Sequence, residues 1–315
     1  MCIRDRMEII RPDASFDIIG KIKLFVGVST AFVALSLLLL MTKGINYGID
    51  FTGGTLVQVQ FKEARPIGDV RSALAGLSLG DTVIQNFGSE EEFLIRVEKS
   101  SGDIKGVESV VRTALIKKFG KDAFEMRRTE MVGPKVGADL RQKALSSMLF
   151  ALIGILIYIS FRFQFRQAIA SVVALLHDVI ITLGVFSLSG KEFSLPIVAA
   201  VLTIIGYSLN DTIVVFDRIR ENTRASRRAE FSGLVNKSIN QTLSRTLLTS
   251  GTTLVAVLAF LILGGDIISD VAFALAVGIV AGTYSSIYVA SPILLAWPET
   301  ARRGSRSKRS STAKA

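Results

Sequence analysis

The sequence predicts a polytopic α-helical membrane protein with six transmembrane helices and one α+β domain outside the membrane. Half of its residues are hydrophobic, and its mean hydropathy is +0.47. A spanning helix needs about 20 mostly apolar residues, and six stretches come close to that length or exceed it. These stretches are residues 24–42, 144–161, 167–190, 193–216, 246–264 and 271–297. We therefore expect six spans, with one long polar insertion after the first.

Lys and Arg gather in the segments that we expect on the cytoplasmic side. Seven lie in the loop 217–245 and six in the tail 298–315, whereas the loops 189–195 and 265–270 hold one Lys between them. Because short cytoplasmic loops are enriched in basic residues, both the N-terminal segment 1–23 and the tail are expected in the cytoplasm. Topology and contact with anionic lipid account for the net charge of +10 without a nucleic-acid partner.

The N-terminal apolar stretch predicts a retained helix. It is longer than the apolar core of a signal peptide, and no small-x-small cleavage pattern comes after it. Residues 1–6 share no pattern with the remainder of the chain, so our hypothesis is that Met7 is the true start. Cys2 is the only cysteine, which excludes disulfides and cysteine metal sites. HExxH, GxSxG and Cys/His pairs are also absent, and we expect no enzyme activity, metal or cofactor.

The insertion at 43–143 predicts a folded extracytoplasmic domain. Period-2 alternation and β-rich runs indicate strands, and helical spacing indicates two helices. The expected elements are strand 55–61, helix 66–77, strand 81–87, strand 93–98, helix 107–119 and strand 123–131, with an acidic turn at 88–92. This β-α-β-β-α-β order is the ferredoxin-like arrangement. The domain carries no catalytic signature and is expected to be a binding surface.

A glycine-rich loop joins the first span to this domain. Gly48-Ile-Asp-Phe-Thr-Gly-Gly54 includes Gly48, Asp50, Gly53 and Gly54. It differs from a dinucleotide-binding fingerprint because the strand comes after the glycines. We expect its glycines to give conformational freedom at the junction.

Asp211 interrupts the otherwise apolar span 193–216. A carboxyl group there costs about 2.5 kcal/mol or more, so a functional role is favoured over a structural hydrogen bond. Tyr207 lies four residues earlier on the same helical face, and Asn210 is adjacent. Asp217 lies at the membrane edge, where an anchoring role is expected.

His177 and Asp178 form a second polar group within a span. Adjacent residues point about 100° apart on a helix, so one could face Asp211 while the other meets a different helix. A proton-relay role and a hydrogen-bonded packing role are equally compatible with the sequence.

Arg245 is the expected cation partner of Asp211. It lies among dense hydroxyl and amide groups in 240–253, including Thr249, which can bond neighbouring helices or a file of water. An arginine reaching to the interface is the alternative.

The sixth span contains a ladder of small residues at four-residue intervals. Gly278, Gly282 and Ser286 belong to it, and such a ladder permits close approach of another helix. Its expected role is helix packing.

Four motifs together resemble the SecD/SecF family of protein-export membrane proteins, within the RND superfamily. They are Gly48–Gly54, Ala174-Leu-Leu-His-Asp-Val179, the segment Tyr207–Glu221 containing Asn-Asp-Thr, and Asn240-Gln-Thr-Leu-Ser-Arg-Thr246. The resemblance covers residues 9–297 and implies an RND-type six-helix half in the bacterial inner membrane. It further implies a heterodimer with a SecD homologue beside the SecYEG channel. Such a pair uses the proton-motive force to drive late steps of translocation of unfolded preprotein. In that family the motif acid and arginine are tied to proton transport, and here they fall on Asp211 and Arg245.

The resulting expectation is that protonation of Asp211 from outside weakens its attraction to Arg245 and moves the ferredoxin-like domain. Two alternatives stay open. An RND-type small-molecule or lipid exporter subunit would need larger external domains than the insertion provides. A non-conducting structural assembly subunit would tolerate Asp211→Asn.

Overall fold

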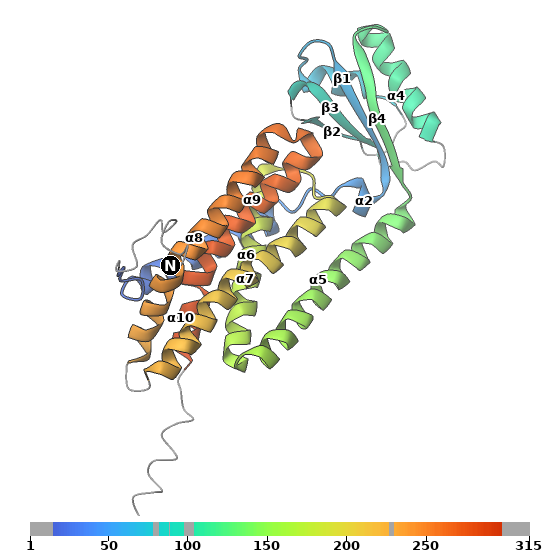
Figure 1. The fold of residues 1–315 in the computed structure, drawn as a ribbon. Helices are drawn as coiled ribbons and strands as arrows, with labels where there is room; N and C mark the ends of the chain where they lie inside the picture. The colour runs from blue at the N-terminus through green and yellow to red at the C-terminus, as the bar shows by residue number, and fades with distance from the viewer. Residues whose placement is uncertain (1–14, 78–81, 88, 98–103, 227–229, 298–315) are drawn as a thin grey trace, which may run out of the picture.

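The computed structural model describes residues 15–77, 82–87, 89–97, 104–226 and 230–297. Long helices run side by side in a bundle, and a small sheet domain stands beyond one end of it (Figure 1). Six helical spans of the described chain are long and apolar enough to cross a membrane, which confirms the predicted fold class. The helices are α1 (Ile22–Thr42), α5 (Pro134–Arg162), α6 (Phe165–Ser189), α7 (Leu195–Ala225), α8 (Phe231–Leu263), and α9 (Gly265–Tyr288) followed by α10 (Ala290–Ala296).

The helices divide into an inner and an outer group. We compare the buried share of the most apolar 18-residue stretch of each span. It is 50% in α6, in α7 and in the span formed by α9 and α10, against 11% in α1 and α5 and 17% in α8. The inner group therefore holds the core of the bundle. The outer helices present broad apolar faces, which suit lipid or a further protein chain.

The predicted loop at 217–245 is wrong, because most of it is helix. The α7 helix continues to Ala225 and α8 begins at Phe231. Arg, Glu, Asn and Gln are compatible with helix, and Arg218 pairs with Glu221 one turn later at 2.5 Å. The charged residues show where the apolar parts of α7 and α8 end, but both helices continue beyond that point.

Two other spans also differ from their predicted bounds. The α5 helix begins at Pro134, ten residues before the predicted span, with proline in the first turn where its missing N–H costs little. The predicted loop 265–270 is the start of α9, and the last span is broken at Val289.

The sheet domain has the predicted ferredoxin-like order. Its strands pair antiparallel in the order β2-β3-β1-β4. The elements are β1 (Gly54–Phe61), α3 (Ile67–Leu74), β2 (Thr82–Phe87), β3 (Ser89–Val97), α4 (Ile104–Phe119) and β4 (Phe124–Val132). The predicted acidic turn is wrong in part, since Glu90–Glu92 belong to β3. The core includes Val57, Phe61, Phe93 and Leu115, all fully buried.

The junction glycines are tightly packed. Gly48 leads into the short helix α2 (Ile49–Thr52), and Gly53 and Gly54 come after it with φ of +72° and +118°. A Cβ atom added to Gly53 would lie 2.8 Å from the Cα of Pro134. The glycines thus permit both left-handed backbone and close approach to α5. At this junction the conformational range of glycine allows one tightly packed backbone conformation.

The same junction is joined to the loop between α6 and α7. The Asp50 carboxylate accepts a hydrogen bond from the backbone N–H of Leu195 at 2.7 Å. The backbone N–H of Gly48 donates to the Phe193 carbonyl at 2.9 Å. The start of α7 is therefore tied to the entry of the sheet domain.

Glu192, in that loop, lies against the sheet. It lies next to Leu56 of β1 and to Leu94 and Arg96 of β3. Burial raises the pKa of Glu192 above the ordinary carboxyl value, and the positive charge of Arg96 opposes this increase. A titratable group therefore lies in the contact between the sheet domain and the helical bundle.

Candidate functional site

Asp178 is the centre of a hydrogen-bonded cluster inside the bundle. Its side chain is 1% exposed. One carboxylate oxygen accepts from Ser208 on α7 at 2.6 Å and from Ser285 on α9 at 2.8 Å. The other lies 2.9 Å from His177 Nδ1. Asp178 thereby connects α6 with both neighbouring inner helices.

His177 extends this cluster to α1. Its Nε2 atom lies 2.7 Å from the Ser29 hydroxyl, and its ring stacks near Tyr284. In a neutral imidazole whose Nδ1 donates to Asp178, Nε2 accepts from the Ser29 hydroxyl, and both ring nitrogens are then satisfied. His177 thus faces α1 and Asp178 faces α7 and α9, so neither side chain hydrogen-bonds to Asp211.

Asp211 has a sparser environment. Its side chain is 2% exposed, and Ser250 on α8 donates to it at 3.0 Å. The Ser250 oxygen lies 2.8 Å from the hydroxyl of Thr283 on α9. Asp211 thus accepts a hydrogen bond from one neighbouring helix, whereas Asp178 accepts hydrogen bonds from two.

The expected ion pair of Arg245 with Asp211 is absent from the described residues. Arg245 is exposed and lines a groove, and the hydrogen bond that α8 donates to Asp211 comes from Ser250. Residues five apart on a helix point about 140° apart. Ser250 therefore takes the face toward α7, which turns Arg245 toward the groove.

The other predicted residues take different positions. Tyr207 packs between α8 and α9, and its buried hydroxyl has no hydrogen-bond partner in the described part of the chain. Asn210 is exposed in the groove, and Asp217 forms an ion pair with Arg162 at 3.7 Å. The Thr249 hydroxyl bonds carbonyl groups of its own helix.

The small-residue ladder of α9 faces α7. A Cβ atom added to Gly278 would lie 2.4 Å from the Ile204 side chain, and one added to Gly282 would lie 2.8 Å from Ser208 Cβ. Ser286 is fully buried and bonds within its own helix. Close packing at Gly282 places Ser208 where it can reach Asp178.

Sequence reasoning missed two members of the cluster around Asp178. Ser29 and Ser285 bond His177 and Asp178, respectively. A single serine in an apolar span is a weak signal, although Ser29 is one of only a few polar side chains in α1.

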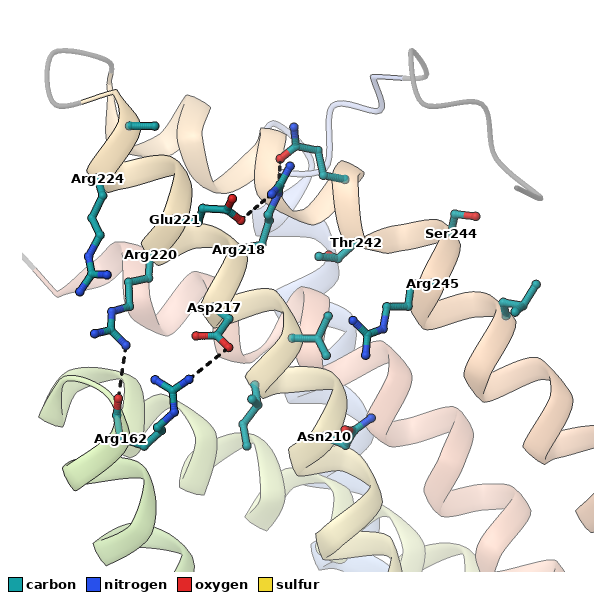
Figure 2. A pocket seen from close by; sticks show the side chains of 15 residues that line it. Arg162, Asn210, Asp217, Arg218, Arg220, Glu221, Arg224, Thr242, Ser244 and Arg245 are labelled. Carbon is teal, nitrogen blue, oxygen red and sulfur yellow. Dashed lines mark hydrogen bonds and ion pairs between the residues drawn. The ribbon is translucent and has the colours of Figure 1, made fainter. Parts of the chain in front are cut away.

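A groove of about 1430 Å³ opens between α7, α8 and the end of α5, and Asn210 lines it. Figure 2 shows that Arg162, Arg220 and Arg224 gather on one side of α7, while Arg245 and Asn210 lie on the other. The groove carries five arginines against two acids. The lining includes Arg162, Asn210, Asp217, Arg218, Arg220, Glu221, Arg224 and Arg245. It reaches the residue next to Asp211 and is a candidate path for protons at this end of the bundle.

Comparison with known proteins identifies two matching families. The family "Protein export membrane protein SecD/SecF, C-terminal" matches residues 111–300, and the SecD/SecF GG motif matches residues 38–64. The junction glycines lie within the second match.

Curated relatives match nearly the whole chain. The protein translocase subunit SecF of Calditerrivibrio nitroreducens is 46% identical over 291 residues, covering 91% of this chain and 96% of the relative. The same subunit of Pseudomonas aeruginosa is 43% identical, covering 86% and 90%. The crystal structure of SecDF from Thermus thermophilus superposes with a TM-score of 0.83 at 40% identity. It covers 92% of this chain, which spans only 39% of that longer protein.

Proposed function

The chain belongs to the SecD/SecF family of protein-export membrane proteins, and from that membership we propose that it is the SecF-type accessory subunit of the Sec protein translocase. It is a multi-pass membrane protein, and its role is in transport. Its partner is a SecD homologue, because this chain corresponds to 39% of the length of a SecDF protein. The broad apolar faces of α1, α5 and α8 provide surface for such a partner.

The proposed location is the bacterial inner membrane, beside the SecYEG channel. The charged ends of α7 and α8, with their arginines, lie on the cytoplasmic side according to the distribution of basic residues. Anionic lipid contacts those ends. The sheet domain then faces outward, where it meets the unfolded preprotein as it emerges.

The proposed energy source is the proton-motive force, and the observation that carries it is the buried Asp211. One charge crossing 100 mV supplies about 2.3 kcal/mol. A tenfold shift in an equilibrium requires about 1.4 kcal/mol, so one proton is sufficient to bias a two-state packing.

The proton changes the contact between α7 and α8. In the charged form, Asp211 holds Ser250 by a charge-assisted hydrogen bond, which is about twice as strong as a neutral one. Protonation weakens this contact and favours a second packing of the two helices. Release of the proton toward the groove lined by Asn210 and Arg245 restores the first. Arg245 contributes its positive charge from the groove, without a direct ion pair to Asp211.

The change reaches the sheet domain through the first turn of α7. Its Leu195 N–H is bonded to Asp50 in the junction, so a displacement of α7 along its axis pulls on the entry to β1. The domain that contacts preprotein is thereby coupled to the charge of Asp211.

The test is Asp211→Asn, expressed with the SecD homologue. We expect normal assembly of the pair, loss of proton-dependent preprotein export into membrane vesicles, and loss of proton flux. Asp139→Asn is the matched control, since it makes the same change on an exposed, ion-paired acid of α5. Normal export by Asp211→Asn would refute the proposal and favour a structural assembly subunit.

A further inference from the structure

Three arginines meet at a corner where two cavities adjoin. Arg162 ends α5, and Arg220 and Arg224 lie one turn apart near the end of α7. All three line both the groove of about 1430 Å³ and a second cavity of about 410 Å³. Figure 2 shows their side chains on the same side of α7.

The positive charge of this corner is poorly compensated. Asp217 pairs with Arg162 at 3.7 Å. Arg220 donates to the Arg162 carbonyl at 3.4 Å, and Arg224 has no hydrogen bond or ion pair within the described residues. Like charges four residues apart on a helix repel each other. An anion would therefore stabilise the arrangement, and the planar guanidinium group of arginine matches phosphate in particular.

Apolar surface lies directly beside the arginines. Phe161 lines the second cavity and is 90% exposed, and Phe165, between the lining residues Gln164 and Arg166 in sequence, is 62% exposed. The remaining apolar lining of this cavity comes from Phe163, Ile219, Phe231 and Leu294. A free phosphate would gain nothing from such neighbours, whereas the acyl chains of a lipid would cover them.

We propose that Arg162, Arg220 and Arg224 bind the phosphate of an anionic phospholipid, whose acyl chains lie against Phe161 and Phe165. This assigns a specific site to the lipid contact of the proposed function, and it rests on the membrane orientation given there. Basic pockets between spanning helices on the cytoplasmic side are suited to such headgroups.

The experiment measures lipid binding to the purified full chain by native mass spectrometry. Phosphatidylglycerol and phosphatidylcholine are added separately to delipidated protein in detergent. We expect phosphatidylglycerol to bind more tightly, and Arg224→Gln to weaken it about tenfold, as for loss of one hydrogen bond to a charged group. Arg224→Lys keeps the positive charge but loses the paired N–H donors of the guanidinium group, and should recover part of the affinity.

Lys237→Gln is the matched control, because it removes one charge from the exposed surface of α8 and lines neither cavity. Equal losses in Lys237→Gln and Arg224→Gln would overturn the proposal in favour of diffuse surface charge. Displacement of phosphatidylglycerol by inorganic phosphate at equal concentration would overturn it in favour of a free-anion site. Unchanged binding by Arg224→Gln would overturn it as well. Lipid binding and preprotein export are measured in separate assays. A negative result for lipid binding would therefore not contradict the proposed role of Asp211.

Discussion

Replacing Gly282 by alanine should separate α7 from α9 and disturb the Asp178 cluster. The added Cβ atom would lie 2.8 Å from Ser208 Cβ, and ordinary contact begins at 3.4 Å. The two helices must therefore move apart by about 0.6 Å. Ser208 cannot retreat without lengthening its 2.6 Å hydrogen bond to Asp178.

The expected loss in the free energy of unfolding is about 0.6 to 2.6 kcal/mol, from three contributions. Inserting a methyl group into a packed interface costs about 1 to 3 kcal/mol. A weakened interhelical hydrogen bond adds about 0.6 kcal/mol. Exchange of glycine for alanine in a helix returns up to about 1 kcal/mol.

The assay is reversible unfolding of the detergent-solubilised chain in rising concentrations of sodium dodecyl sulfate, followed by circular dichroism. Gly154→Ala is the control, because a Cβ atom there would meet no other atom within 4 Å. It should gain stability by up to about 1 kcal/mol from helix propensity alone. If Gly282→Ala is as stable as Gly154→Ala, the close packing of α7 against α9 at this glycine is refuted.

Three further changes test other contacts. Ser285→Ala removes one of three donors to Asp178 and should lower stability by about 0.6 to 1.7 kcal/mol in the same unfolding assay, without abolishing export. Asp50→Ala leaves the Leu195 N–H unpaired and should increase hydrogen exchange at the start of α7 while assembly with the SecD homologue is retained. Burial raises the pKa of Glu192 in the folded protein above the ordinary value of 4.5, so the folded state binds more protons than the unfolded state. The stability of the fold therefore falls as pH rises from that ordinary value through the raised pKa. Protection of the sheet-domain junction from hydrogen exchange should accordingly be greater at acidic pH, and Glu192→Gln should remove that dependence; a variant that keeps it would refute the assignment to this group.

The sequence was sufficient to predict the spans and the sheet domain because both depend on local patterns. Long apolar runs define spans, and alternation defines strands. The length of α7 and α8 could not be predicted in this way, since polar residues such as those around Arg218 are compatible with helix inside or outside a membrane.

The sequence was sufficient to predict the two acids of the site, but it did not predict which residues hydrogen-bond to them. Asp178 and Asp211 were conspicuous because a buried carboxylate is costly. Whether Arg245 or Ser250 faces Asp211 depends on the rotation of α8 about its axis, which packing against α7 and α9 determines. Ser29 contacts His177 across 148 positions of sequence, and only the crossing of α1 over α6 brings them together.

The α5 helix forms a mechanical link between the two ends of the molecule. It starts after a single residue beyond β4, an edge strand of the sheet, and runs unbroken for 29 residues to Arg162. At 1.5 Å per residue it is about 43 Å long. A rotation of about 5° around the Arg162 end displaces the Pro134 end by about 4 Å, roughly the spacing of neighbouring strands. A binding partner that rotates the last turn of α5 would therefore displace the edge strand β4 at the other end of the helix.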